Sequence, residues 1–287
     1  MKHIFLLGIL IPGLLIRIIF LNQHDIWFDE AFSFFVAGSS LSDILAATAA
    51  DNHPPLYELM LHFWMQIFGT TAIVMRTFSL TLGLLSLPVF YLLAKKLVNK
   101  QSALFALTIM ALSPLMIYFS TETRMYSLFV LLSLLSVLFF LYIIKKQTTI
   151  NISYFIFFFT SALYTHYYSL LLFIPFTLLA LKQTGLNRLR LFLLLIIPFF
   201  LFFPWIIVYF SAPHPEFINT SAVVALPATL VSFILGGTGQ VTLRTYFGNH
   251  TFLWIKSLFS ITSIVILFMG LIGTLKVAKI KNGRIIF

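Results

Sequence analysis

The feature that most constrains this chain is a series of apolar stretches of about 20 residues, the length of a helix that crosses a bilayer. These stretches are Ile4–Leu21, Met75–Ala94, Ser102–Phe119, Met125–Ile144, Ser153–Leu181, Arg190–Phe210 and Phe252–Leu275. The 29 residues of Ser153–Leu181 are long for one span and short for two. We therefore predict a tight hairpin of two short helices there, with Tyr164–Ser169 at its tip, and about eight spans in total.

Composition excludes the other classes of fold. Hydrophobic residues make up 60% of the 287 residues and charged residues 9%, against about 45–50% and about 25% in ordinary soluble domains. The chain has no cysteine, so disulfides and thiol chemistry are excluded. The expected fold class is all-α: a polytopic transmembrane helix bundle forming one domain over residues 1–287.

The placement of basic residues predicts the topology, since Lys and Arg accumulate in cytoplasmic loops. With the N-terminus inside, thirteen of the 18 basic residues fall on the cytoplasmic side. The chain is therefore expected to be an integral protein of the cell or inner membrane with both termini cytoplasmic. The net charge of +10 follows from this topology, and no basic patch interleaved with aromatic residues indicates nucleic acid.

The acidic residues all fall on the opposite, extracytoplasmic side. They are Asp25, Asp29, Glu30, Asp43, Asp51, Glu58, Glu122 and Glu216. The remaining basic residues lie on or near the same side, so charge of both signs gathers at the outer face. We expect the chemistry of the protein at that face.

Two outer loops are long enough to carry structure, residues 22–74 and residues 211–251. In the first loop we predict interfacial helices lying along the membrane surface. Their ranges are Phe28–Val36, Ser42–Ala50 with Ser42 as the cap, and Leu56–Phe68 beginning after Pro54 and Pro55. In the second loop the apolar stretch Ser221–Leu235 is too short to span easily, so we expect it to be interfacial as well.

Asp29 and Glu30 follow the first span directly. Two adjacent acids at a membrane surface serve as a cation site, a helix-start pair or a catalytic base. Burial beside Trp27, Phe28 and Phe32 would raise the pKa of a carboxyl toward that of a useful base. The three interpretations stay open on the residues alone.

Two histidines occupy defined turns. His53 precedes two prolines that fix the backbone, and a turn-and-cap role explains those prolines better than it explains the histidine. His166 lies at the predicted hairpin tip, where a polar turn at membrane depth must be buried in protein or line a wet cavity. We expect His166 to be a ligand, a proton carrier or a phosphate contact, against an alternative of an interfacial aromatic belt.

The arginines have competing explanations. Arg17 in the first span is expected to snorkel to the headgroups, and Arg76 at the start of the second span has the same ordinary explanation. Glu122 and Arg124 share a short outer turn, where such residues more often pair with each other than with a ligand. Guanidinium groups nevertheless suit phosphate, and ionisable groups at membrane depth are by default functional candidates.

The order of these motifs resembles the membrane glycosyltransferases of the GT-C fold, in particular the dolichyl-phosphate-mannose protein mannosyltransferases and the bacterial aminoarabinose transferases. The resemblance covers roughly residues 1–210. The motifs that carry it are Trp27-Phe-Asp-Glu-Ala31, His53-Pro-Pro-Leu-Tyr57, Arg76-Thr-Phe-Ser79, Lys95-Lys96, Tyr118-Phe-Ser-Thr-Glu-Thr-Arg-Met-Tyr-Ser127 and Thr165-His-Tyr-Tyr168.

The resemblance implies inverting transfer of a sugar from a polyprenyl-phosphate donor to a lipid, glycan or protein acceptor at the extracytoplasmic face. It implies that Asp29 is the general base and that Glu30 supports it. The residues assigned to substrate binding are His53, Tyr57, Arg76, Glu122, Arg124, Tyr126 and His166. The aminoarabinose branch has Lys at the position of His53 and an acid at that of Asn52, so the phosphate contact and any divalent metal site stay open.

Two other functions stay open as alternatives. A lipid-linked sugar transporter or flippase would place ionisable residues near the membrane midplane and often show inverted repeats, which we do not detect. A non-catalytic scaffold, or an inactive fragment, would tolerate substitution of Asp29, Glu122 and Arg124. Relatives of the GT-C type usually carry several more spans and a further outer domain, so we interpret this chain as a truncated or compact form.

Overall fold

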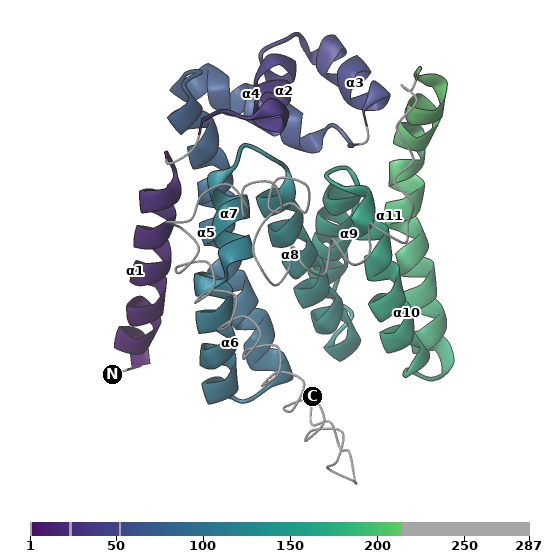
Figure 1. Ribbon diagram of the computed structural model, residues 1–287. Coiled ribbons are helices and arrows are strands. Elements are labelled where there is room, and N and C mark those ends of the chain that lie inside the picture. Colours follow the sequence, from purple (N-terminus) through teal and green to yellow (C-terminus); the bar gives the residue numbers. More distant parts are fainter. Residues whose placement is uncertain (1, 23–24, 52, 214–287) are drawn as a thin grey trace, which may run out of the picture.

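A computed structural model describes residues 2–22, 25–51 and 53–213, and these residues form helices and no β-strand. A bundle of long helices stands beneath a layer of three short helices, which we term the cap (Figure 1). The predicted span Phe252–Leu275, the interfacial stretch Ser221–Leu235 and nearly all of the second outer loop lie outside the described residues.

The bundle is built from one apolar helix after another. Its elements are α1 (Lys2–Phe20), α5 (Ala72–Leu97), α6 (Lys100–Leu112), α7 (Pro114–Thr121), α8 (Tyr126–Lys145), α9 (Thr149–Leu163), the 3-10 helix η1 (Tyr167–Leu172), α10 (Phe173–Leu181) and α11 (Gly185–Ser211). Helices α5, α8 and α11 are each long and apolar enough to cross a membrane. Each predicted span within the described residues coincides with an apolar helix or a pair of them, which confirms the all-α membrane class.

The third predicted span is broken. Helices α6 and α7 together are long enough to cross the membrane, but they meet at Ser113 with a bend of 52°. Pro114 is the first residue of α7 and has no N–H to continue the hydrogen bonds of α6. The bend therefore follows from a single residue, and it leaves the last carbonyl groups of α6 without helical partners.

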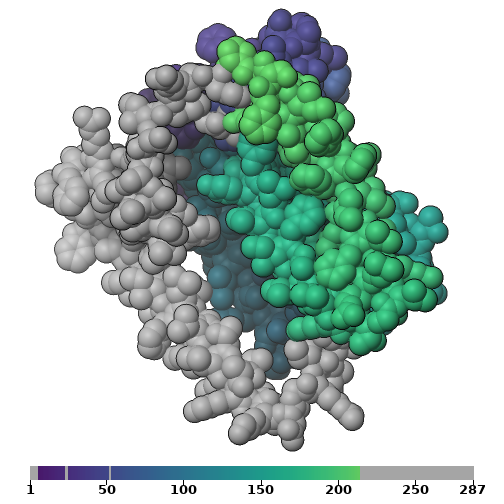
Figure 2. Space-filling view, turned by 90° about the vertical axis from the view of Figure 1, so that its right-hand side faces the viewer, coloured from purple at the N-terminus to yellow at the C-terminus, as the bar shows by residue number. Residues whose placement is uncertain are grey.

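The predicted hairpin of two short helices is confirmed over Thr149–Leu181. Helix α9 lies against α8 and α11, and the chain reverses at Tyr164–His166 before η1 and α10 return. Phe155, Phe159 and Phe176 are fully buried between these helices. Helix α11 closes this side of the bundle (Figure 2) and carries exposed aromatic residues along its outer surface.

The cap consists of the three helices predicted for the first outer loop. Their bounds are α2 (Phe28–Ala37), α3 (Leu41–Ala50) and α4 (Leu56–Phe68). One detail of the prediction is wrong: Ser40, not Ser42, caps α3, because the helix begins at Leu41 and the Ser40 hydroxyl accepts the N–H of Asp43. Helix α4 buries Leu61 and Met65 against the bundle, while Ile67 on its other side is exposed.

The prediction that Arg17 snorkels to the headgroups is wrong. Its side chain is 1% exposed and donates from Nη1 to the carbonyl of Ala111, 2.6 Å away, near the end of α6. A buried guanidinium that supplies donors to a broken helix gains more from this contact than from water at the membrane surface.

Candidate functional site

The candidate site lies where the cap meets the short turn between α7 and α8, residues 122–125. Helix α2 brings Asp29 and Glu30 to this place in its first turn, where the helix dipole favours negative charge. The turn contributes Glu122 and Arg124, and α4 contributes Glu58. The structure therefore gathers four of the eight acids that the sequence placed at the outer face, together with Arg124.

Glu30 is held in a buried ion pair with Arg76 of α5. The guanidinium donates from Nε to Oε1 at 2.9 Å and from Nη2 to Oε2 at 2.6 Å. Arg76 also donates to the carbonyl of Leu21 at 3.2 Å, and Thr123 donates its backbone N–H to Glu30 Oε1 at 2.9 Å. Arg76 and Glu30 thus join α1, α2, α5 and the turn. This arrangement gives both residues a positioning role, while their predicted roles toward substrate stay predictions.

Asp29 differs from Glu30 because its carboxylate reaches the surface. Its side chain is 33% exposed, and Oδ2 lies 3.9 Å from Nε of Arg124. Arg124 is buried and also approaches the Asp29 carbonyl and the Ser33 hydroxyl, each at 3.4 Å from Nη1. Asp29 therefore combines access with a nearby cation, as a catalytic carboxylate requires.

Glu122 lies behind this pair, and its carboxyl group does not pair with the Arg124 side chain, so the expected side-chain pairing within the turn is wrong; the backbone N–H of Arg124 donates to the Glu122 carbonyl at 2.9 Å. The Glu122 side chain is fully buried, and neither carboxyl oxygen has a hydrogen-bond partner among the described residues. The Trp27 indole N–H lies beside it and favours the ionised carboxylate, although the two groups are not aligned as a regular hydrogen bond. Burial, with the neighbouring charge of Glu30, raises the pKa of Glu122 to about 8. Glu122 is therefore a neutral acid at pH 7.

Glu58 is a buried acid that the sequence prediction did not assign to the site. It is 1% exposed, and its Oε2 has no hydrogen-bond partner within the described part of the chain. Burial raises its pKa to about 7 although the charge of Arg124 acts in the opposite direction. The signal was the spacing of Glu58, Leu61 and Met65, which puts the three side chains on one face of a helix.

The two predicted histidines are brought together. The rings of His53 and His166 lie 5.7 Å apart between centroids, and Leu56 donates its N–H to the carbonyl of Tyr164 at 3.0 Å. His53 Nδ1 lies 3.0 Å from Asp51 Oδ2. The start of α4 is therefore docked on the hairpin tip, as a shared site requires.

The surroundings of His166 favour the neutral form of its ring. Its Nδ1 accepts the backbone N–H of Tyr168 at 3.1 Å. Burial, followed by the charges of His53 and Arg124, lowers its pKa to about 4. His166 is therefore neutral at pH 7 with its proton on Nε2, which makes it a hydrogen-bond donor rather than a cation.

The two predicted tyrosines have different surroundings. Tyr57 is fully buried, and its hydroxyl lies 2.9 Å from the Ser79 hydroxyl of α5. Tyr126 stacks on Phe119, with ring centroids 4.3 Å apart, and lies 6.1 Å from the ring of His166. Tyr126 is therefore placed beside the histidines, while Tyr57 fixes α4 on the bundle.

A divalent metal does not fit the described site. No three His, Asp or Glu side chains come together as ligands within the described residues. Arg76 compensates the charge of Glu30, Arg124 lies beside Asp29, and Glu122 is neutral through burial. The guanidinium groups of Arg76 and Arg124 lie where a metal cation would contact Glu30 and Asp29. The proposed reaction therefore uses no metal.

Comparison with known families decides the assignment. Residues 52–208, more than half of the chain, match the model of the dolichyl-phosphate-mannose-protein mannosyltransferase family. The chain belongs to this family. No curated protein matches it.

The fold of this mannosyltransferase-family chain is also found in a solved structure, that of ArnT from Cupriavidus metallidurans in the apo state. The two share 15% sequence identity with a TM-score of 0.60, over 92% of this chain and 55% of ArnT. The chain thus spans about 55% of the length of that protein and shares its GT-C fold. The resemblance inferred from the sequence motifs is confirmed at this level.

The family match does not cover every site residue. His53, Tyr57, Arg76, Glu122, Arg124, Tyr126 and His166 lie within residues 52–208, while Asp29 and Glu30 precede the matched region. The contacts of Glu30 with Arg76 and Thr123 connect that preceding segment to the matched region. The site is therefore continuous in space across the boundary of the match.

Proposed function

We propose that this protein transfers a sugar from a polyprenyl-phosphate donor to an acceptor at the extracytoplasmic face of the membrane. The observation that carries the proposal is the position of Asp29, an accessible carboxylate beside a buried arginine at the outer end of an apolar bundle. A donor with a charged head and a lipid tail suits such a place. Membership of a mannosyltransferase family gives the same reaction class.

In the proposed reaction Asp29 is the general base. It takes the proton of the acceptor hydroxyl as that oxygen attacks the anomeric carbon from the side opposite the phosphate, which inverts the configuration. The carbon–phosphate oxygen bond breaks, and the phosphate departs with its electron pair. Phosphate is already a good leaving group, so the reaction needs positioning and cationic support more than a strong general acid.

Arg124 supports the departing phosphate. Its Nη1 is directed at Asp29 and Ser33, while its Nε has no hydrogen-bond partner among the described residues. A guanidinium with a donor to spare at the outer membrane boundary suits a phosphate oxygen. His53 and the neutral His166 contribute further donors to the phosphate or the sugar head.

The supporting residues keep Asp29 and Arg124 in place. Glu30 and Arg76 fix the first turn of α2 to α5 and to the turn after α7. Glu122, as a neutral acid, adds no negative charge that would repel the donor phosphate. The distribution of Lys and Arg supports an extracytoplasmic site, since those residues favour the other side. The acceptor is a lipid, a glycan or a protein.

The test is mass spectrometry of the polyprenyl-phosphate pool in the source cell. The strains are the wild type, a deletion, and the deletion carrying either Asp29→Asn or the control Asp43→Asn, an exposed acid of α3. We expect one sugar-charged lipid to accumulate in the deletion and with Asp29→Asn, and not with Asp43→Asn. The accumulated species identifies the donor sugar.

Other outcomes separate the alternatives. An unchanged lipid pool in every strain contradicts transfer and favours a scaffold. Full rescue by Asp29→Asn contradicts the role of Asp29 as the base. Accumulation of the charged lipid on the cytoplasmic side alone, measured by protection from an added periodate oxidant, indicates a flippase instead.

A further inference from the structure

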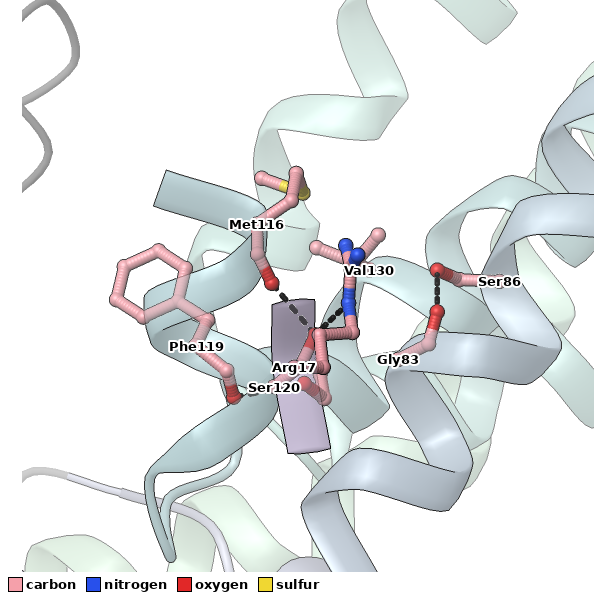
Figure 3. Close-up of a pocket in the computed structure, with 8 residues that line it drawn as sticks. Arg17, Gly83, Ser86, Met116, Phe119, Ser120 and Val130 are labelled. Atoms are coloured by element: carbon pink, nitrogen blue, oxygen red, sulfur yellow. Dashed lines mark hydrogen bonds between the residues drawn. The ribbon is translucent and has the colours of Figure 1, made fainter. Parts of the chain in front are cut away.

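Arg17 has no place in the proposed mechanism, yet it is among the most buried side chains of the described bundle. It lies on α1, where Nη1 donates to the carbonyls of Gly13 at 2.9 Å and Ala111 at 2.6 Å. Its Nε donates to the Ser120 hydroxyl at 3.2 Å. Arg17 therefore contacts both sides of the bend, α6 through Ala111 and α7 through Ser120. Figure 3 shows the contact with Ser120.

The bend is where these donors are needed. Ala111 belongs to the last turn of α6, whose carbonyls have no helical partners. The bend of 52° turns α7 away from them. An unsatisfied carbonyl at this depth is costly, so the guanidinium that donates to it stabilises the bent shape of the span against a straight one.

Helix α7 is closely packed on its other side. The Ser120 hydroxyl, which accepts from Arg17, donates in turn to the carbonyl of Met116. Gly83 of α5 faces Ser120 so closely that a Cβ atom there would lie 2.8 Å from the Ser120 Cβ. Ser127 of α8 donates to the Phe119 carbonyl at 2.8 Å. Arg17, Gly83 and Ser127 thus fix α7 from three different helices.

Helix α7 leads directly into the turn that carries the site. It ends at Thr121, and the next residues are Glu122, Thr123 and Arg124. The angle of α7 therefore sets where Arg124 lies relative to Asp29. A displacement of about 1 Å in such a group costs about 10²-fold in rate.

We propose that Arg17 is a positioning residue for the transfer reaction: it holds the α6–α7 bend and thereby places Arg124 beside Asp29. This inference rests on the proposed function, because its kinetic effect is an effect on sugar transfer. It assigns a role to a buried cation within the membrane part of the bundle, remote from the acceptor and the donor sugar.

The first test compares Arg17→Gln with Arg17→Lys and with the control Arg188→Gln, an exposed arginine of α11. The substrate is the sugar-charged lipid purified from the deletion strain. We expect Arg17→Gln to lower kcat by about 10²-fold with KM for the lipid little changed. Arg17→Lys keeps the positive charge and a single donor nitrogen, so we expect it to retain part of the transfer rate. Arg188→Gln should match the wild type.

An engineered disulfide between α1 and α6 provides the second test. Because the chain has no cysteine, the introduced cysteines have no native cysteine to pair with. A Cβ atom at Gly13 would lie 3.3 Å from the Cβ of Ala111, close to the spacing of about 3.8 Å in disulfides. Gly13→Cys with Ala111→Cys in the Arg17→Gln background replaces the lost contact between α1 and α6. Oxidation should restore most of kcat, and reduction should remove it again. If Arg17→Gln alone does not fold, the tethered variant is folded in its oxidised form, and its kcat is then compared before and after reduction of the disulfide.

Amide hydrogen exchange gives a readout that needs no activity. We expect faster exchange in residues 122–125 of Arg17→Gln, slowed again by the engineered disulfide. Exchange that rises throughout the bundle, or a wild-type kcat in folded Arg17→Gln, would each overturn the proposal. If the wild type transfers no sugar, the proposed function fails, and the exchange pattern at residues 122–125 alone then supports or overturns the placement by Arg17.

Discussion

The guanidinium of Arg76 meets the carboxylate of Glu30 at two points, with Nη2 2.6 Å from Oε2 and Nε 2.9 Å from Oε1, and both side chains are 1% exposed. The same carboxylate accepts the N–H of Thr123. A single side chain of α2 therefore joins the cap, the long helix α5 and the turn that carries Arg124. The distance between Asp29 and Arg124 depends on this junction.

Removing one member of the pair is expected to destabilise the protein strongly. Glu30→Gln or Arg76→Met leaves the partner as an uncompensated buried charge, which costs about 3–5 kcal/mol. Glu58→Gln is the matched control, because Glu58 is equally buried but forms no ion pair among the described residues. Unfolding in detergent measures the three variants, and the double variant Glu30→Gln/Arg76→Met should recover part of the loss. A small effect of Glu30→Gln, equal to that of Glu58→Gln, would contradict this.

Stability is expected to fall as the pH rises from about 4.5 to about 8. Burial raises the pKa of Glu58 to about 7 and that of Glu122 to about 8, from an ordinary value of 4.5. The folded state therefore binds more protons than the unfolded state in this window, and the stabilisation present at low pH is lost as each group ionises. Thermal unfolding at a series of pH values measures the slope. Glu58→Gln/Glu122→Gln should flatten it, and an equal slope in wild type and variant would exclude these two groups.

His166 has the opposite effect on the acid side. Its pKa is lowered from 6.5 to about 4 by burial and by the charges of His53 and Arg124. The unfolded state then binds more protons between these values, so the stability present above pH 6.5 declines as the pH falls toward 4. His166→Asn keeps an acceptor for the Tyr168 N–H and removes the titration. We expect a shallower acid decline in the thermal midpoint of this variant, and an unchanged decline would show that another group causes it.

Gly83→Ala is expected to displace α7. The added Cβ would meet the side chain of Ser120, and overpacking of this kind costs about 1–3 kcal/mol. Gly8→Ala is the control, since no atom lies within 4 Å of a Cβ at that helical position. Thermal unfolding and the transfer rate are the measurements. A Gly83→Ala variant that matches Gly8→Ala in both thermal midpoint and transfer rate would contradict this expectation.

Local signals predicted the elements of the fold well. Pro54 and Pro55 set the start of α4, and the length of the apolar stretch Ser153–Leu181 predicted the short hairpin. Both sequence signals lie within the element that they predict or within a few residues of it. The bounds of the cap helices accordingly agree with the predicted ranges to within a residue or so.

The structure brings together many of the residues that the sequence analysis named, but it adds Glu58 and contacts that no local spacing indicates. Glu30 and Thr123 are 93 positions apart in the chain, and no local spacing shows that they touch. Glu122 has Arg124 two residues away as a natural partner, but the fold directs that arginine to α2 instead. Arg17 was expected at the headgroups because the broken helix that accepts its donors lies 94 residues further along. Local sequence patterns do not specify such pairings.

The bond from the Leu56 N–H to the Tyr164 carbonyl also has a consequence for biogenesis. The first turn of the last cap helix is completed by a residue that the ribosome adds more than 100 positions later. At a synthesis rate of about 5–20 residues per second, the cap waits for roughly 5–20 s before this bond can form. The end of the molecule that carries the candidate site is therefore assembled late, only after the hairpin has been made.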